Sequence, residues 1–514
     1  MSGGIELHKR DTATWLAFGV LALLLGGSAF AFGAVEMWAV EWLRFGILVA
    51  LGLVLWSRPP GRVFGGPVLA VLIPGAALLV WAGLQIVPLP PGVLRALSPK
   101  AAATYAETVP AGGGEALPAW LLAKAGVEGV TIEDGAAAPK GPADAGDARA
   151  GRTLSIYPHG TRRAILAWVT MLAFVAVAAR LARNEFSRYR LLWVTGGWSG
   201  TVALVAFLHR LSGSDKVLWL RPRPSDSRPL GPFVNPDHLG GYVVLGLLVL
   251  VGLALALASR PTGRLDRRGI RLAVLERSWI QPRLLVLGVL AGVSLIGLYL
   301  SGSRGAWLGL VSGILFLIAG KTLGKRWIAT AFIGVIAVGL SAGMIGHIVP
   351  GARMTPHVSV AQDGSLALRL DAWAKTMDVV FDYPLTGTGL GTFQWAFVSY
   401  QREGEWQIWA EAHNDYLQLL SETGAVGLLL LVACLTMFIW KVVLPAFDPA
   451  PDARRWTTIG VAAAVFAMLV HSIVDFNLQI PAVGALFATL VGVLAATAED
   501  RPSEPMRAEK EATS

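Results

Sequence analysis

Residues 411–427 read EAHNDYLQLLSETGAVG, and this polar stretch stands directly before a long hydrophobic run in a mostly apolar chain. It predicts a helix that begins at a polar surface and continues into a membrane span. A titratable side chain beside a membrane is costly to place, so it usually has a function. His413, near the start of the stretch, is therefore the first candidate functional residue.

The composition is that of an integral membrane protein. Of the 514 residues, 54% are hydrophobic and 15% are charged, whereas soluble domains carry about 25% charged residues. The single cysteine, Cys434, excludes a disulfide framework and a cysteine-based metal site. The net charge of +9 comes from arginines that cluster in loops, so it does not indicate nucleic-acid binding.

The hydrophobic runs predict an all-α membrane protein with about 12 transmembrane helices. Each run is near the roughly 20 residues that a helix needs to cross the hydrocarbon. The expected spans are 15–33, 40–56, 67–87, 164–180, 191–208, 239–258, 284–300, 306–320, 328–348, 425–444, 457–475 and 480–497.

The basic residues of the short loops predict that both chain ends are cytoplasmic. Residues 411–427 then face the opposite, outer side. The expected regions are N-terminal membrane helices (1–87), a first periplasmic loop (88–163), a membrane core (164–348), a second periplasmic loop (349–423), C-terminal membrane helices (424–497) and a disordered cytoplasmic tail (498–514).

The two long outer segments differ in character. The first is rich in Ala, Gly and Asp in its middle, and we expect it to be partly flexible, with one short helix near 119–125. The second contains a helical apolar pattern over 366–381, which predicts an amphipathic helix at the interface. Pro384 ends that helix, and a glycine-rich turn follows at 386–391.

Arg304 is the clearest candidate among the outer arginines. It lies in Ser301-Gly302-Ser303-Arg304-Gly305, a short break between two apolar runs. An arginine at a helix end can simply extend toward the headgroups. The small residues around it, however, leave room for a ligand and offer backbone N–H groups to an anion.

Two further arginines share that side. Arg228 lies in a proline- and glycine-containing turn before the sixth run, with Arg221 and Arg223 nearby, and lipid headgroup contact is the alternative role. Arg369 belongs to the expected amphipathic helix, where the alternative is a solvated side chain paired locally with Asp371.

A base and several arginines on one outer surface indicate a specific kind of substrate. A neutral imidazole such as that of His413 can accept a proton near pH 7. Arginines bind phosphate oxygens with two parallel hydrogen bonds and stay charged. The combination suits a lipid-linked phosphate or diphosphate, with His413 deprotonating an incoming hydroxyl and the arginines stabilising the leaving group.

The neighbours of His413 provide candidates for a supporting role. These are Asn414, Asp415, Glu422 and His238, while His471, within an apolar run, is expected to be a packed helix residue. No Asp, Glu or His cluster has convincing metal-ligand spacing, so we expect no metal and no other cofactor, with the arginines in place of a divalent cation.

Several segments together resemble the O-antigen ligase and polymerase superfamily (WaaL and Wzy type). They are Ala412–Leu417 with the following Glu422-Thr423-Gly424, the turn at 301–306, residues 369–373 leading to 384–393, and the turn at 231–238, in which Asp237 stands where the family more usually has Asn.

The resemblance implies a GT-C-like membrane glycosyltransferase in the bacterial inner membrane with a periplasmic active site. The implied donor is an undecaprenyl-diphosphate-linked glycan, and transfer would invert the anomeric carbon without a metal. By motif, His413 would be the base, Arg304 and Arg228 would bind the diphosphate, and Arg369 would assist.

The family motifs leave the acceptor open. A ligase transfers the glycan to lipid A–core, whereas a polymerase extends another lipid-linked repeat of O-antigen or exopolysaccharide. A polyprenyl-linked sugar transporter or flippase is the alternative of another class. Such a protein is expected to carry charges along a path through the bilayer, and the apolar runs here are nearly free of them.

Overall fold

The computed structural model describes residues 2–57, 63–108, 152–222, 229–259, 267–322, 325–348, 364–402, 405, 408–447 and 452–499. The long helices are α1 (Ser2–Phe30), α2 (Met37–Trp56), α3 (Gly66–Gln85), α7 (Pro158–Ala182), α8 (Glu185–Ser212), α9 (Pro236–Ala258), α10 (Arg267–Ser301), α11 (Arg304–Thr322), α12 (Lys325–Ile348), α13 (Gly364–Asp382), α15 (Asp415–Phe438), α17 (Asp452–His471) and α18 (Pro481–Glu499). The short elements are η1 (Phe32–Ala34), α4 (Pro91–Leu97), α5 (Pro99–Thr108), α14 (Phe393–Phe397), η3 (Val398–Tyr400), η4 (Ile439–Val443), α16 (Leu444–Ala446) and η5 (Asn477–Gln479).

The predicted all-α membrane architecture is confirmed. Within the described residues, ten helices are long and apolar enough to cross a membrane. The two remaining expected spans, at 306–320 and 328–348, correspond to α11 and α12, which contain the shorter apolar helices Arg304–Gly320 and Arg326–Ala342.

Helices α9, α17 and α18 form the centre of the bundle. Their apolar windows are 78%, 72% and 89% buried, more than those of the other candidate spans. Helices α9 and α17 cross at Gly252 and Gly460. The two backbones are so close there that a Cβ on Gly252 would lie 2.9 Å from the Gly460 Cα. Small residues at such a crossing let two helix backbones pack in van der Waals contact.

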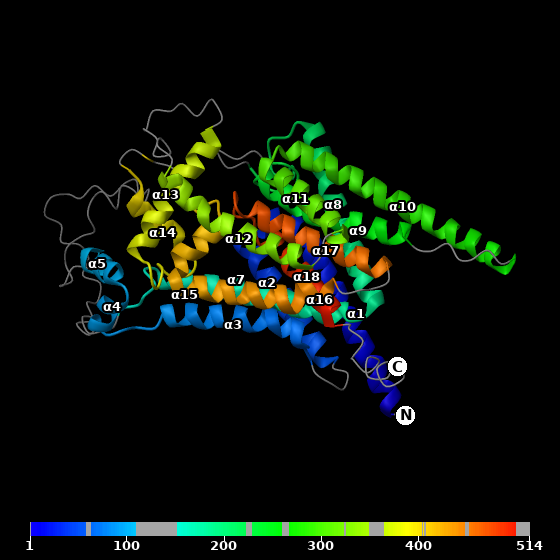
Figure 1. Ribbon diagram of the computed structural model, residues 1–514, viewed down its shortest axis with the longest axis horizontal. Helices are drawn as coiled ribbons and strands as arrows, with labels where there is room; N and C mark the ends of the chain where they lie inside the picture. Colours follow the sequence, from blue (N-terminus) through cyan, green and yellow to red (C-terminus); the bar gives the residue numbers. More distant parts are fainter. Residues whose placement is uncertain are drawn as a thin grey trace.

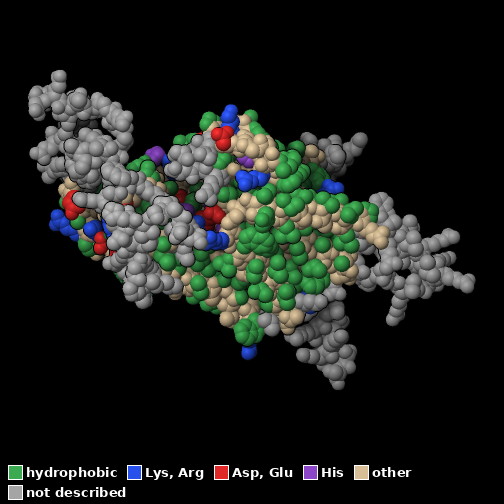
Figure 2. All heavy atoms as spheres, turned by 90° about the horizontal axis from the view of Figure 1, so that it is seen from above, with side chains coloured by type: hydrophobic (Ala, Val, Ile, Leu, Met, Phe, Trp, Pro, Cys, Tyr) green, Lys and Arg blue, Asp and Glu red, His purple; other side chains and the backbone are tan. Residues whose placement is uncertain are grey.

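The two ends of the bundle differ. Helices α4, α5, α13 and α14 gather at one end, and the N-terminal end of α1 lies at the other (Figure 1). Seen from above, acidic and histidine side chains gather toward the α13 end, whereas the rest of this face is largely hydrophobic (Figure 2). The polar stretch that begins α15 is therefore at the end that carries most of the non-spanning structure.

Helices α4 and α5 were not expected from the sequence. They occupy the start of the 88–163 segment and pack Leu94 and Ala101 against Val379 of α13 and against Tyr383, which follows that helix. The short helix expected near 119–125 lies outside the described residues. The helix expected over 366–381 is confirmed as α13.

The glycine-rich turn after α13 joins that helix to α15. Gly387, Gly389 and Gly391 have φ values of 67°, 111° and 74°, which glycine adopts without the steric cost of a Cβ. A Cβ on Gly387 would lie 2.2 Å from the Glu422 carbonyl carbon. The turn can therefore rest directly on the α15 backbone, which fixes α13 relative to α15.

Candidate functional site

His413 stands at the entrance to α15 in an unusual backbone conformation. Its φ is 51°, in the left-handed region that non-glycine residues seldom occupy. The next residue, Asn414, caps the helix by accepting from the N–H groups of Tyr416 and Leu417 at 3.0 and 3.1 Å. Its amide also donates to the Gly339 carbonyl of α12 at 3.0 Å. Asn414 thus fixes the helix start, and with it the position of His413.

Asp475, in the connection between α17 and α18, lies next to the His413 ring. The Asp475 Oδ1 is 3.3 Å from the His413 Nδ1, and the side chains are 2% and 25% exposed, respectively. The backbone N–H of Phe476 also donates to that Oδ1, at 2.9 Å. Because Nδ1 is the His413 ring nitrogen that faces the carboxylate, Nε2 is the nitrogen left to accept a proton.

The electrostatics of Asp475 favour its charged form. Burial alone would raise the pKa of its carboxyl, but hydrogen bonding to His413 and the nearby rings of His238 and His471 outweigh burial and hold the pKa below its ordinary value. A buried, ionised carboxylate is well placed to stabilise a neighbouring imidazole when that imidazole gains a proton.

Aromatic rings enclose His413 on two sides. The ring centroids of Trp409 and Phe476 lie 5.6 and 4.7 Å from that of His413, both nearly perpendicular to it. Phe476 makes a similar edge contact with His238, at 4.8 Å. Phe476 therefore lies between the two imidazoles, and the His413 ring is held in one orientation.

Arg369 and Arg304 lie on different helices, and each is next to a residue that adjoins one of the histidines around Asp475. Arg369, on α13, lies 3.6 Å from the carboxylate of Asp237, which precedes His238 in the first turn of α9. Arg304 is the exposed first residue of α11, and the following Gly305 packs against the ring of His471. Arg228 lies outside the described residues.

The turn before Arg304 is built from the small residues noted in the sequence. Gly302 has a φ of 64°, the Ser301 hydroxyl accepts from the Ser303 N–H at 3.2 Å, and the Ser303 hydroxyl accepts from the Ala306 N–H at 3.2 Å. A Cβ on Gly240 of α9 would lie 2.8 Å from the Ala306 Cβ. The turn is thus capped and pressed against α9, so the α11 start has a defined position.

Asp415 and Glu422, the two carboxylates near His413 in the sequence, bind different parts of the structure. The Asp415 N–H donates to the Ser472 carbonyl at 3.0 Å, and its carboxylate lies 3.4 Å from the Leu478 N–H, so Asp415 ties α15 to the α17–α18 connection. The Glu422 carboxylate instead accepts from the N–H groups of Gly391 and Phe393 at 2.8 and 3.0 Å. In this structure Glu422 holds the glycine-rich turn.

The sequence patterns missed Asp475 as a functional candidate, because the run at 457–475 is expected to form a span. His471 is a buried residue at the end of α17, as expected. Asp475 is a carboxylate at the end of an apolar run, and that costly placement is the signal that could have drawn attention to it.

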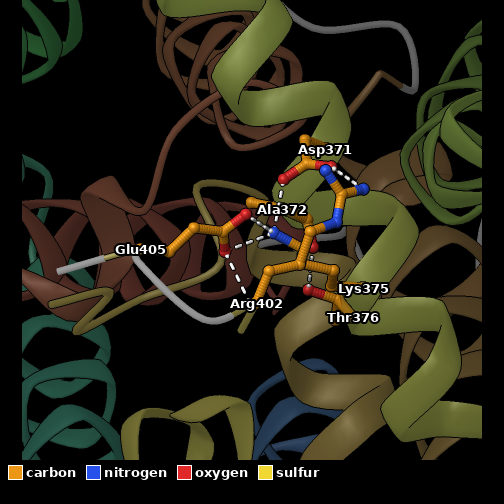
Figure 3. Close-up of polar contacts among 6 residues, drawn as sticks. All are labelled: Asp371, Ala372, Lys375, Thr376, Arg402 and Glu405. Atoms are coloured by element: carbon orange, nitrogen blue, oxygen red, sulfur yellow. Dashed lines mark hydrogen bonds and ion pairs between the residues drawn. The ribbon is translucent and has the colours of Figure 1, made fainter. Parts of the chain in front are cut away.

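A buried ion cluster attaches α13 to the segment that leads to His413 (Figure 3). The Lys375 Nζ lies 2.6 Å from the Asp371 carboxylate and 2.6 and 2.7 Å from the two Glu405 oxygens. Arg402 adds a 3.4 Å contact to Asp371. Farther along, the Trp373 indole donates to the Ala412 carbonyl at 3.0 Å. Helix α13 therefore positions the residues just before His413.

Replacing Lys375 by Met is expected to destabilise the folded protein by about 2–4 kcal/mol, because two largely buried carboxylates lose their shared cation. The position of His413 should become less defined as the segment before it loosens. Thermal unfolding in detergent measures the first effect. Lys100→Met is the matched control, since the Lys100–Asp382 pair is 47% and 40% exposed and such pairs contribute about 0–1 kcal/mol. Equal losses in both variants would contradict the role of the cluster.

Glu411, two residues before His413, links stability to pH. Burial raises the pKa of its carboxyl to about 8, against a smaller opposite effect of the hydrogen bond from Gln418. The folded protein therefore keeps a proton that the unfolded chain, with an ordinary pKa of 4.5, releases. Stability contributed by this group is present at low pH and is lost between about pH 5 and pH 8.

Glu411→Gln is expected to remove that pH dependence. The variant and the unaltered protein should unfold at similar temperatures at pH 5, and the variant should unfold at the higher temperature at pH 8. Unfolding midpoints at four pH values between these limits test the expectation. Two curves that stay parallel across the window would mean that Glu411 does not hold the proton.

Comparisons with known proteins agree with the sequence resemblance. Residues 289–432 match the family model Wzy_C, described as O-Antigen ligase, and this segment contains Arg304, Arg369 and His413. No curated protein matches the chain. Residues 289–432 are therefore similar to an O-antigen ligase domain, and this similarity supports the O-antigen ligase and polymerase superfamily.

Proposed function

We propose that this protein is an inverting glycosyltransferase that moves an undecaprenyl-diphosphate-linked glycan to an acceptor hydroxyl. The reaction would take place on the periplasmic face of the bacterial inner membrane. The observation that carries the proposal is the His413–Asp475 pair, at 3.3 Å, beside arginines of a domain that matches the O-antigen ligase family.

In the proposed reaction, His413 acts as the general base. The acceptor O–H gives its proton to the His413 Nε2 as its oxygen attacks the anomeric carbon of the donor. The bond between that carbon and the diphosphate oxygen breaks, and the electron pair leaves with the diphosphate. Attack from the face opposite the leaving group inverts the anomeric carbon.

The proposed role of the arginines is to bind the diphosphate and stabilise its developing charge. Arg304 is exposed at the start of α11, where the helix N-terminus also favours an anion. Arg369 is held near the site by Asp237, and Arg228 is assigned by motif. Two or three guanidinium groups supply the charge that a divalent cation supplies in other phosphate-transferring sites.

Arg304→Lys tests the geometry of this contact. A lysine keeps the charge but lacks the planar fork that binds two phosphate oxygens. We expect transfer to fall by about 10–100-fold, which corresponds to about 1.4–2.7 kcal/mol of lost transition-state binding. Arg326→Lys, at the start of α12, is the control, because it makes the same substitution outside the site. Normal transfer by Arg304→Lys would rule out two-point binding.

The central experiment is transfer by the purified protein in vesicles that contain a synthetic undecaprenyl-diphosphate glycan and a candidate acceptor. We expect transfer to continue in the presence of a chelator. Loss of activity on chelation, with recovery on adding Mg²⁺, would contradict the metal-independent reaction. Movement of the donor across the bilayer without any new glycosidic bond would instead support a transporter.

The acceptor is resolved by glycan analysis of a deletion strain. Accumulation of full-length lipid-linked polymer beside unmodified core lipid would identify a ligase acting on lipid A–core. Accumulation of single lipid-linked repeats would identify a polymerase of O-antigen or exopolysaccharide. The ligase reaction is our first expectation.

A further inference from the structure

His471, the last residue of α17, lies on the far side of the Asp475 carboxylate from His413. Its Nε2 is 3.7 Å from the Asp475 Oδ2, and both side chains are 2% exposed. The other oxygen of the carboxylate is the one that faces His413 and the Phe476 N–H. The carboxylate is therefore placed between two imidazoles, one at the surface of the site and one buried.

The same edge of the His471 ring, at Nε2 and Cδ2, touches the helix that carries Arg304. A Cβ on Gly305 would lie 2.6 Å from the His471 Cδ2 and 2.7 Å from its Nε2. No real Cβ fits at these distances, so glycine is required for the ring and the α11 backbone to approach this closely. Because Gly305 follows Arg304 directly, the ring sets how near the start of α11 lies to Asp475.

We propose that His471 is a positioning residue that joins the base to the diphosphate-binding arginine. Its Nε2 lies 3.7 Å from the Asp475 Oδ2, and its ring holds the start of α11 at a fixed separation from that carboxylate. A buried carboxylate is costly unless its oxygens have partners. Among the described residues the Asp475 Oδ2 has no other hydrogen-bond partner, so a proton on the His471 Nε2 would supply one on the side away from His413. This inference rests on the roles proposed above for His413 and Arg304.

The surroundings of His471 fit this role. The Asp475 carboxylate, which also lies beside His413, is 3.7 Å from the His471 Nε2, and Gly305, next to Arg304, packs against the same ring. His471 thus lies between the carboxylate that supports the base and the start of α11, and at 2% exposure it is too deeply buried to touch a substrate.

Two substitutions at His471 separate positioning from simple packing. His471→Leu fills the site without a donor, and we expect kcat to fall about 10–100-fold while KM for the lipid-linked donor stays within about twofold, since small misplacements of a catalytic group cost rates of this order. His471→Asn keeps a side-chain N–H for Asp475, and we expect it to retain most of the activity. The readout is steady-state transfer by folded, purified protein in vesicles.

Gly305→Ala tests the contact between the His471 ring and the start of α11. The added methyl must displace either His471 or the start of α11, so we expect kcat to fall and KM for the donor to rise together. Adding His471→Asn, which has a smaller side chain, should restore part of the loss. Gly313→Ala is the matched control on the same helix, because its Cβ would meet the Leu248 Cδ1 at 2.5 Å and does not face His471.

The outcomes are distinct. Wild-type kcat in His471→Leu, or equal losses in Gly305→Ala and Gly313→Ala, overturns the positioning role while leaving the proposed function intact. Loss in both His471 variants to the same degree shows that volume, not hydrogen bonding, matters, and this also overturns it. Absence of any transfer by the unaltered protein refutes the proposed function itself.

Discussion

His413→Asn is expected to lower the rate of glycan transfer by about 10²–10⁴-fold, the contribution usual for a positioned general base. The asparagine amide cannot accept a proton near pH 7. Asparagine also tolerates the left-handed backbone conformation better than alanine does, and residue 413 has a φ of 51°. The loss should therefore reflect chemistry and not a misfolded α15 entrance.

The measurement is transfer of a labelled glycan by purified variants whose thermal unfolding midpoints match that of the unaltered protein. KM for the donor should change little, because the proposed role of His413 concerns the acceptor hydroxyl. His159→Ala provides a control, since His159 is exposed at the start of α7 and contacts Tyr157. A His413→Asn variant that transfers at the normal rate would exclude His413 as the base.

Local patterns in the sequence predicted much of the architecture. Long apolar runs must form helices in a membrane because unpaired backbone groups are too costly there, and the spans follow from that constraint. Helix α13 follows from apolar residues at helical spacing, and the turn at Arg304 follows from a short break between two apolar runs. The polar stretch at 411–427 likewise marked the start of α15. Each of these features depends on residues that are close together in the chain.

The pairing of charges was predictable only in part, because it depends on the tertiary fold. Local pairing of Arg369 with Asp371 was the alternative that the sequence offered, yet Arg369 lies beside Asp237 and Asp371 pairs with Lys375. Lys375 also binds Glu405, thirty residues away. No helical spacing indicates which distant carboxylate a basic side chain will meet.

The same limit explains why Asp475 was missed. His413 and Asp475 are separated by the whole of α15 and α17, so their contact exists only because α15 begins and α17 ends at the same face of the bundle. Glu422 shows the converse, because it is near His413 in sequence but its carboxylate binds the glycine-rich turn. Proximity in the chain favoured Glu422, and the fold favours Asp475.

Asp475→Asn is the substitution expected to have the second large effect, a fall in kcat of about 10²–10⁴-fold. The equivalent change in a serine protease triad costs about 10⁴-fold although the geometry is kept. The Phe476 N–H, 2.9 Å from Oδ1, should keep the amide oxygen of the variant toward the His413 Nδ1. The shape of the site is then retained, and what is lost is the negative charge that stabilises the imidazole as it takes a proton.

A double variant decides whether Asp475 acts through His413. If the carboxylate serves only to orient and charge-stabilise that ring, it has nothing left to support once the ring is gone. His413→Asn with Asp475→Asn should then be no slower than His413→Asn alone, because residues that act as a unit are strongly non-additive. Rates that multiply in the double variant would show that Asp475 contributes independently, for example as a base in its own right. In that case the dependence of transfer on His413 would need a different explanation from proton transfer to a carboxylate-supported imidazole.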